Sequence, residues 1–549
     1  MKKILNYTIY CIALSCFLAT HAKALGNKEL EAKINALVPA EINDSTPGLV
    51  IGIVHKDKLI FSKGYGMANI SYGMPNDPKM VYNTGSVSKQ FLGYAFAMLH
   101  VDGKLNLDDP VGKYMQDWPE FKHKVTLRHL LSHTSGYREA YTMSNLAGRI
   151  VGVDHLSRKE CLDVVRNQPE LEFIPGSRYT YNSTAWVILA EVLEKVTGQP
   201  ADKWVEDNIL KPLDMKDTQI ESYVGDVIIN TAESYSYDEK QGFKNEESNR
   251  AIFGAAEVYS NIDDMVKWIK NFKTAEIGGQ NVNTLFLKPF MLNDGTNSDY
   301  ALGIKNESYR GLKRYRHTGG HEAFLTQLSY YPEQDLGIYT VTNYGGKGWI
   351  DTSKIAEILL EKHMIPSIKT AREQIDVKQE KLEQLKGLYV AETLNRTLDL
   401  NTEEGKLVQG ETKLIATASN TFYLDGRDVK YQFKNTPNQT QLTITDGAKY
   451  SYFKAEKWTP NEVDLNIFKG NYWSDELETV YHLIIKDKNL TIKHRWLGEI
   501  ALMPAAKDFF TTEWGFYVKF NRNKKGEVIN LSVYSGRTLN VIFQKKPLQ

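Results

Sequence analysis

The sequence has little of what covalent or metal-held structure requires. Its 549 residues include three cysteines, none in a Cys-x-x-Cys pair, and 12 scattered histidines without His-Glu-x-x-His spacing. Such spacings are the usual signs of a cysteine-held site or a bound zinc ion. A glycine-rich phosphate loop is also missing. We therefore expect no metal ion, no cofactor, and chemistry that uses side chains alone.

Net charge is absent as well, because 67 basic residues balance 67 acidic ones. This balance gives no reason to expect nucleic acid as a partner. The N-terminus begins Met1-Lys2-Lys3, continues with the apolar run Ile4–Ala19 and reaches the small-residue pattern Ala22-Lys23-Ala24. That order is typical of a Sec-type signal peptide, so we expect a secreted or periplasmic protein. The run is shorter than the roughly 20 residues that span a bilayer, and no membrane span is expected after cleavage.

A lipid anchor at Cys16 is not expected, because Ala13-Leu14-Ser15 fits a lipidation site poorly and apolar residues follow. Cleavage after residue 24 removes Cys11 and Cys16 and leaves Cys161 alone. A single thiol cannot form an internal disulfide, so Cys161 is expected to be a buried apolar side chain.

Ser86 and Lys89 stand three residues apart in Thr84-Gly85-Ser86-Val87-Ser88-Lys89, ahead of an apolar run with helical spacing. Residues three apart share one face of a helix. A lysine in a dry pocket can lose its proton near neutral pH and then activate a serine. Ser86 is the candidate nucleophile and Lys89 its activator. The pattern is weak alone, since Ser451-Tyr452-Phe453-Lys454 repeats it in a strand-like segment.

The second motif is Tyr181-Asn182-Ser183, which runs into an apolar helix expected over Val187–Val196. A tyrosine beside Lys89 could act as base toward Ser86 and later as acid toward the leaving group. The alternative is that Tyr181, one of 31 tyrosines, only packs at the start of the helix.

The third motif is His317-Thr318-Gly319-Gly320, ahead of a strand expected over Phe324–Tyr331. Glycines let a backbone approach a substrate closely. Backbone N–H groups of Ser86 and Gly320 could then form an oxyanion hole for a tetrahedral intermediate. On its own, a His-Thr-Gly triplet is more often an ordinary strand end.

With these motifs in this order, the chain resembles the penicillin-recognising serine hydrolases, which include class C beta-lactamases, D-alanyl-D-alanine carboxypeptidases, D-aminopeptidases and esterases. The resemblance covers about residues 28–363 and includes the leucine-rich segment Leu127–Gly136. It implies that Ser86 is acylated by the substrate and that Lys89 and Tyr181 move protons. It also implies that His317 to Gly319 line the strand facing the nucleophile.

Two positions depart from the family pattern. The family's middle motif is Tyr-x-Asn, whose asparagine binds the substrate amide in beta-lactamases and carboxypeptidases, but here the third position is Ser183. Those enzymes also carry Lys-Thr-Gly on the facing strand, where lysine helps to hold a substrate carboxylate; the residue here is His317, mostly neutral at pH 7. Ser183, His317, Gly319 and Gly320 are the expected substrate-binding and oxyanion residues. The pattern resembles D-aminopeptidases or esterases more than beta-lactamases.

Glu257 stands in Ala255-Ala256-Glu257, where relatives typically have a glycine pair. A carboxylate that faces the pocket could hold a substrate's free amino group. The alternative, which we favour, is a surface or helix-capping charge. His129 and His133 are expected to satisfy local hydrogen bonds, and His321 to lie at the pocket rim outside the catalytic set.

After about residue 384, helical spacing gives way to short alternating strands that repeat once. Leu385–Tyr389 recurs 83 residues later as Phe468–Tyr472, and the same offset relates Lys406-Leu407 to Asn489-Leu490. Two matches at one offset indicate a duplication. Each repeat predicts a small antiparallel barrel or sandwich. This layout resembles D-aminopeptidases whose catalytic domain is followed by two lipocalin-like barrels that help to shape access to the site. The alternative is that the barrels only stabilise the protein or bind a partner.

We predict an α+β protein with a beta-lactamase/transpeptidase-like catalytic domain, an antiparallel sheet flanked by helices, and two small all-β barrel-like domains. The expected parts are a signal peptide (residues 1–24), a serine hydrolase domain (25–363), a linker (364–383) and two repeats (384–459 and 460–549). A first hairpin is expected from Leu49–Val54 and Leu59–Phe61. The strand Phe324–Tyr331 is expected to pair with Leu336–Thr342, and a helix over Ile350–Lys362 to pack on the sheet.

The leading hypothesis is a secreted serine hydrolase that forms an acyl-enzyme and cleaves amide bonds in D-amino-acid-containing peptides or amides. One alternative is a carboxylesterase with the same residues, because an alkoxide leaving group needs less protonation than an amine. Others are a beta-lactamase or penicillin-binding D-Ala-D-Ala carboxypeptidase, and a weakly active protein whose barrels bind a cell-wall or peptide ligand. In each case the partner is a small molecule or a peptide.

Overall fold

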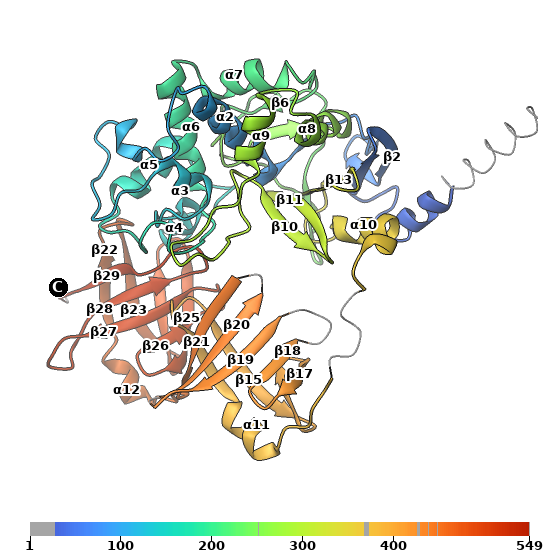
Figure 1. Cartoon of the computed structure of the whole chain (residues 1–549). Helices are drawn as coiled ribbons and strands as arrows, with labels where there is room; N and C mark the ends of the chain where they lie inside the picture. Colours follow the sequence, from blue (N-terminus) through green and yellow to red (C-terminus); the bar gives the residue numbers. More distant parts are fainter. Residues whose placement is uncertain are drawn as a thin grey trace, which may run out of the picture.

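The computed structural model describes residues 28–547, apart from residues 251, 367–372, 425–428, 438 and 447. Figure 1 shows a domain of helices and sheet, coloured blue to yellow, followed by an orange and then a red β-barrel. The expected signal peptide, with Cys11 and Cys16, lies outside the described residues. Within the described part of the chain, no helix is long and apolar enough to cross a membrane.

The predicted catalytic domain is built on a six-stranded antiparallel sheet with the order β10-β11-β12-β13-β1-β2. Its strands are β1 Leu49–His55, β2 Lys58–Tyr65, β10 Lys305–Tyr309, β11 Leu312–His321, β12 Phe324–Tyr331 and β13 Leu336–Thr342. The predicted first hairpin is confirmed as β1 and β2, and the predicted pairing of the two later strands as β12 and β13.

Both faces of this sheet are buried, because alternate side chains of a strand point to opposite faces. Val50 and Val54 of β1 join one hydrophobic cluster, and Ile51 and Ile53 join another. Helix α8, Ile262–Thr274, packs on the first face, and α10, Thr352–Leu360, on the second. The predicted antiparallel sheet with helices on both sides is therefore confirmed.

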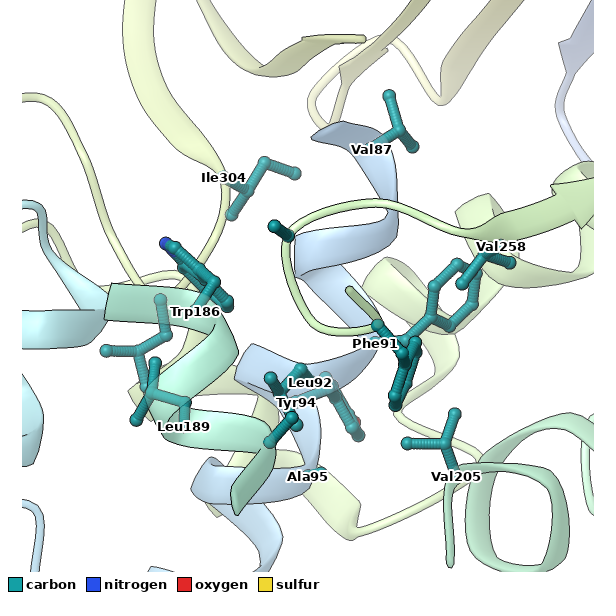
Figure 2. Close-up of a cluster of buried hydrophobic side chains, with 14 of the residues drawn as sticks. Val87, Phe91, Leu92, Tyr94, Ala95, Trp186, Leu189, Val205, Val258 and Ile304 are labelled. Atoms are coloured by element: carbon teal, nitrogen blue, oxygen red, sulfur yellow. The ribbon is translucent and has the colours of Figure 1, made fainter. Parts of the chain in front are cut away.

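The helical side of the domain holds the start of the site. A 3-10 turn, η1 Gly85–Ser88, leads directly into α2, Lys89–Val101, which packs against α6, Thr184–Thr197. Figure 2 shows the large apolar side chains of these two helices in one core, namely Phe91, Leu92 and Tyr94 with Trp186 and Leu189. Fully buried packing of this kind fixes the position of the turn ahead of α2.

The remaining elements of the domain are short. The helices are η2 Val111–Lys113, α3 Leu127–Leu131, α4 Ala140–Leu146, α5 Arg158–Arg166, α7 Ala201–Val205, η3 Glu206–Leu210, α9 Gly279–Phe286 and η4 Glu361–His363. The strands are β3 Met67–Asn69, β4 Met74–Pro75, β5 Tyr82–Asn83, β6 Gln219–Ile220, β7 Tyr235–Asp238, β8 Gly242–Asn245 and β9 Val258–Ser260. Cys161, on α5, is buried and free, as expected.

The chain then forms two closed barrels of eight strands each. The first follows α11, Gln379–Leu385, and comprises β14 Gly387–Ala391, β15 Thr397–Glu403, β16 Lys406–Gln409, β17 Thr412–Ala418, β18 Thr421–Leu424, β19 Lys430–Asn435, β20 Thr440–Asp446 and β21 Ala448–Ala455. The second follows α12, Glu462–Asn466, and comprises β22 Gly470–Ser474, β23 Thr479–Lys486, β24 Asn489–His494, β25 Gly498–Ala506, β26 Phe509–Thr511, β27 Tyr517–Arg522, β28 Val528–Tyr534 and β29 Val541–Lys546.

The two barrels share details at the predicted offset of 83 residues. The buried Tyr389 hydroxyl donates a hydrogen bond to the Leu385 carbonyl oxygen at 2.7 Å, and Tyr472 donates in the same way to Phe468 at 2.9 Å. In the first barrel this bond ties the first strand to the last residue of α11, and in the second barrel to the second residue after α12. The alternating pattern did not predict α11 or α12, because such short helices carry too little periodicity.

The second barrel packs on the helical side of the catalytic domain, where Figure 1 shows it against α4. Met143 and Leu146 of α4 belong to the hydrophobic cluster of this barrel. The Tyr481 hydroxyl of β23 donates a hydrogen bond to the Leu146 carbonyl oxygen at 2.7 Å. The first barrel contacts the second through a small apolar cluster that includes Leu388 and Phe509.

Candidate active site

Ser86 is presented to solvent by a segment that is otherwise hidden. From Met80 to Ala97 every residue is buried except Ser86. The turn is held from behind, because the Ser88 hydroxyl lies 2.9 Å from that of Thr84 and accepts a hydrogen bond from the Val258 backbone N–H at 3.1 Å. A nucleophile must be both fixed and reachable, and Ser86 meets both conditions.

Lys89 is completely buried, and its ammonium nitrogen Nζ lies 3.2 Å from the Ser86 Oγ. Nζ also donates to the carbonyl oxygen of Ala255. It forms no salt bridge with any residue that the structure describes. Burial is the main cause that holds the pKa of Lys89 well below its usual range, and the positive charge of Arg537 lowers it further. The fold therefore favours the neutral amine, which can accept a proton from Ser86.

Tyr181 lies over this pair, with Lys89 Nζ 5.2 Å from the centre of its ring. Its hydroxyl is buried without a hydrogen-bond partner of good geometry among the described residues. Burial raises the pKa of Tyr181 to about 12, and the nearby Ser86 hydroxyl acts in the opposite direction. The phenol thus stays protonated near neutral pH and is a proton donor rather than a base.

His133 holds Tyr181 in place, a role the sequence did not assign to it. Its ring packs against the Tyr181 ring at a tilt of 32° with centroids 4.1 Å apart, and its Nδ1 accepts a hydrogen bond from the Asn182 backbone N–H at 2.9 Å. The Asn182 side chain donates to the Tyr137 carbonyl oxygen and accepts from the Ala185 N–H in the first turn of α6, so both ends of its amide are bonded within the protein. Ser183 is buried beside them, and its hydroxyl makes no hydrogen bond with the described residues.

The strand β11 brings Gly319 and Gly320 against the turn that carries Ser86. A Cβ atom on Gly319 would clash with the Thr84 carbonyl oxygen and would lie 3.1 Å from the Ser86 backbone nitrogen. A Cβ atom on Gly85 would lie 2.5 Å from the Gly320 backbone nitrogen. The structure thus brings the backbone nitrogens of Ser86 and Gly320 to the same junction, as an oxyanion hole requires.

His317 is buried and already bonded on both nitrogens. Its Nδ1 lies 2.6 Å from the Thr318 carbonyl oxygen, to which it can only donate, and its Nε2 therefore accepts from the Tyr300 hydroxyl at 2.8 Å. Burial lowers the pKa of His317 to about 3. It is neutral at pH 7 and brings no positive charge to the site.

Glu257 corrects our expectation of a surface or capping charge. Its side chain is completely buried, and α8 is capped by Asn261 instead, whose side chain accepts from the Asp264 N–H. Glu257 also has a positive φ of 81°, where a glycine would be unstrained. Burial raises the pKa of Glu257 to about 8, and its Oε1 has no hydrogen-bond partner in the described structure.

Glu257 belongs to a buried cluster beside the site. Its carboxylate, that of Glu221 and the His321 ring place their ligand atoms within 4.8 Å of one another, a spacing that could hold a metal ion. The Arg250 Nη2 lies 3.3 Å from the His321 Nδ1, and its charge opposes the ionisation of that ring. Arg250 therefore already supplies positive charge to this cluster. His321 is buried rather than exposed at a rim.

A cavity of about 770 Å³ opens beside Tyr181 at the junction of all three domains. Its wall includes Arg178 and Tyr179 from the catalytic domain, Arg396 from the first barrel and Arg537 from the second. The Arg537 guanidinium lies 5.1 Å from the centre of the Tyr181 ring. Arg537 follows β28 at a distance of more than 350 residues from Tyr181, and no spacing signal in the sequence could have found it.

The family profile described as Beta-lactamase matches residues 29–361 of the chain. A putative D-alanyl-D-alanine carboxypeptidase of Escherichia coli O157:H7 is 27% identical over 40% of this chain and 55% of its own length. The D-aminopeptidase of Brucella anthropi is 23% identical over 55% of this chain and 56% of its own length. The chain thus spans about half the length of these curated relatives.

Among solved structures, the octameric penicillin-binding protein homologue from Pyrococcus abyssi superimposes with a TM-score of 0.54 at 20% identity. The superposition covers 78% of this chain and 99% of that protein. A likeness at this identity establishes the shared fold.

Proposed function

The chain belongs to the beta-lactamase family, and from this premise we propose that it is a serine hydrolase that forms an acyl-enzyme at Ser86. The observation that carries the proposal is the pairing of a solvent-reachable serine with a buried lysine that has no acidic partner in the described structure, 3.2 Å away. A neutral amine at that distance is within reach to remove the serine proton as the hydroxyl attacks a carbonyl carbon.

Each proton in the proposed reaction has a place in the site. Lys89 takes the proton of Ser86, whose oxygen attacks the substrate carbonyl, and the backbone N–H groups of Ser86 and Gly320 bind the oxyanion. Tyr181, kept neutral by a pKa raised to about 12, protonates the departing amine and recovers a proton from Lys89. Water then hydrolyses the acyl-enzyme by the same steps in reverse. Ser183 is assigned to substrate contact beside Tyr181.

We assign the substrate to amides and peptides that contain D-amino acids. Two relatives that share about half their length with the chain, a D-aminopeptidase and a putative D-alanyl-D-alanine carboxypeptidase, support this class. The neutral His317 supports it further, because the family's lysine at that position would hold the carboxylate of a penicillin. An esterase with the same residues is the second candidate, since the neutral strand places no charge requirement on the substrate.

The mature protein should be tested on D- and L-alanyl p-nitroanilides, a short-chain p-nitrophenyl ester and a chromogenic cephalosporin. We expect selective turnover of the D-anilide and a covalent acyl adduct on the Ser86 peptide by mass spectrometry. Ser86→Ala should abolish both, and Ser71→Ala, at an exposed turn between β3 and β4 away from the cavity, should leave both unchanged. Ester turnover alone would establish an esterase, and full activity of Ser86→Ala would remove the nucleophile assignment.

We also propose that the protein acts outside the cytoplasm, on the strength of the N-terminal signal pattern alone. N-terminal sequencing of the protein from cell envelope and medium fractions is expected to start near Leu25. Recovery of uncleaved protein in the cytoplasm would contradict this localisation.

A further inference from the structure

The loop between β28 and β29 of the second barrel is fixed to the catalytic domain. The Glu172 carboxylate accepts a hydrogen bond from the Leu539 backbone N–H at 3.1 Å, and the Arg138 guanidinium donates to the carbonyl oxygens of Leu539 and Asn540. Arg138 and Glu172 are nearly inaccessible to solvent and also bond each other at 3.1 Å. The loop therefore has a defined position at the edge of the site.

This tether places Arg537 at the mouth of the site with its charge uncommitted. The guanidinium faces the Tyr181 ring, and it forms no salt bridge or side-chain hydrogen bond with any described residue. Arg138, in the same interface, is by contrast fully neutralised by Glu172 and Glu476. Arg138 is already bound by two carboxylates, whereas Arg537 has none. Arg537 is therefore available to bind an anion.

Arg537 is one of four cations that share the cavity of about 770 Å³. The others are Arg178, Arg396 and Lys449, and Glu392 is the one acidic residue of the wall. Within the part of the chain that the structure describes, none of the four cations forms a salt bridge. A chain with equal numbers of acidic and basic residues has thus gathered unpaired positive charge from three domains into one cavity.

Arg178 is half-buried, whereas Arg396, Lys449 and Arg537 are exposed, so solvent screens the repulsion among the four charges. An anion that enters the cavity relieves the repulsion that remains. Burial is the main cause that lowers the pKa of Arg178, the Glu172 carboxylate opposes it, and the positive charge of Arg396 adds a smaller lowering.

The aromatic rings of Tyr179 and Tyr450 complete the wall and suit the apolar part of a peptide. The neutral His317 provides no positive charge on the strand, but Arg537 provides one 5.1 Å from the centre of the Tyr181 ring.

We propose that this three-domain cavity binds the carboxylate end of an acidic or free-acid peptide substrate, with Arg537 as the cation of the cavity that lies beside Tyr181. The inference rests on the proposed hydrolase function and names its substrate class. It assigns the barrels a direct role in substrate binding, because three of the residues that it uses, Arg396, Lys449 and Arg537, belong to them.

The test uses the full mature protein and pairs of peptides that begin with D-alanine and end, after one to three glycines, in either a free carboxylate or an amide. The wild-type protein is expected to favour the free acid at least tenfold in kcat/KM, mainly through KM, and to lose this preference in high salt. Arg537→Gln and Lys449→Gln should each reduce the acid-to-amide ratio severalfold. Lys449→Glu should reverse the charge preference, so that a peptide ending in a basic group is turned over faster than the free acid.

Lys406→Gln, an exposed lysine of the first barrel outside the cavity, is the matched control and should keep the wild-type ratio. The ratio, not the rate, is the readout, because Arg537 also affects Lys89 and would change both substrates together. Equal turnover of acid and amide by the wild type, or an unchanged ratio in both cavity variants, would overturn the inference.

Calorimetry with the Ser86→Ala protein separates this inference from the proposed function. Preferential binding of the free-acid peptides, lost in a Ser86→Ala/Lys449→Gln double variant, supports the cavity assignment even where the wild type hydrolyses no peptide. Equal binding of acid and amide forms, or no binding of either, refutes it independently of any activity.

Discussion

We expect the protonation state of Lys89 to determine how the reaction rate depends on pH. In the proposed mechanism its neutral form is the active one, and burial together with Arg537 lowers its pKa. The rate should therefore rise as pH increases through this lowered pKa. Removing the positive charge of Arg537 raises the pKa of Lys89, so we expect Arg537→Gln to move the acid limb of the kcat/KM profile to higher pH.

The profile should be measured with a neutral D-alanyl anilide, so that binding of a substrate carboxylate does not contribute. Arg495→Gln, an exposed arginine of the same barrel, is the control and should leave the acid limb in place. An acid limb that moves to lower pH in Arg537→Gln, or does not move, would show that another group governs it.

Glu257 gives a prediction for stability rather than for rate. Its pKa is about 8 in the folded protein and near 4.5 when unfolded, since burial outweighs the lowering effect of Arg250. Between these values the folded state keeps a proton that the unfolded state releases, so the contribution of Glu257 to stability is present below pH 4.5 and falls as pH rises toward 8. Glu257→Gln cannot ionise and should remove this component.

Differential scanning calorimetry from pH 5 to pH 8.5 is the measurement. We expect the melting temperature of the wild type to fall toward alkaline pH more steeply than that of Glu257→Gln. Glu478→Gln, at an exposed position, should follow the wild type. Parallel curves for wild type and Glu257→Gln would mean that Glu257 is already ionised in the folded protein.

At the scale of elements, the contact between β11 and η1 decides whether the site forms. Gly319→Ala would drive a Cβ atom into the Thr84 carbonyl oxygen. The clash is with backbone, so it cannot be relieved by rotating a side chain. We expect a loss of about 1–3 kcal/mol in the free energy of unfolding and a large fall in activity, because Ser86 would be displaced. Gly320→Ala is the matched control for stability, since its Cβ atom would meet only Leu325 at 3.7 Å.

Chemical denaturation of the two variants measures the difference. Gly320→Ala should unfold at a denaturant concentration close to that of the wild type, and Gly319→Ala at a clearly lower concentration. Equal stability of both variants would show that the turn at Ser86 is free to move away from the strand.

The same elements show what the sequence could and could not predict. Hydrophobic alternation placed β1, β12 and β13 to within one residue and found the start of β2, whose end at Tyr65 lies four residues beyond the predicted Phe61. The 83-residue offset located both barrels, because these features are local or repeated. The burial of Glu257 was missed, since a positive φ at one residue leaves no pattern in the sequence. His133 and Arg537 were also missed as parts of the site, because their contacts to Tyr181 arise only when distant segments pack together.

At the scale of the molecule, the second barrel and the catalytic domain are joined through Arg138. This guanidinium bonds the Glu476 carboxylate at 2.8 and 3.0 Å and the Glu172 carboxylate at 3.1 Å, with all three side chains almost excluded from solvent. Removing one partner of a buried ion pair leaves the other charge poorly compensated. These ion pairs of Arg138, which form the joint between the two domains, therefore link the stability of the protein to the position of the loop that carries Arg537.

Glu476→Gln tests this coupling with a side chain of the same shape. We expect a loss of about 1.5–3 kcal/mol in stability, as for a hydrogen bond to a charged group, and a severalfold fall in kcat/KM for free-acid peptides as Arg537 loses its fixed position. Glu478→Gln, two residues away and exposed, should change neither quantity. If Glu476→Gln loosened the barrel, seen as faster proteolysis between residues 455 and 470, yet kept the full acid-to-amide ratio, then substrate selection would not depend on this joint. A parallel loss of stability and of acid preference would instead show that the interface positions part of the binding site.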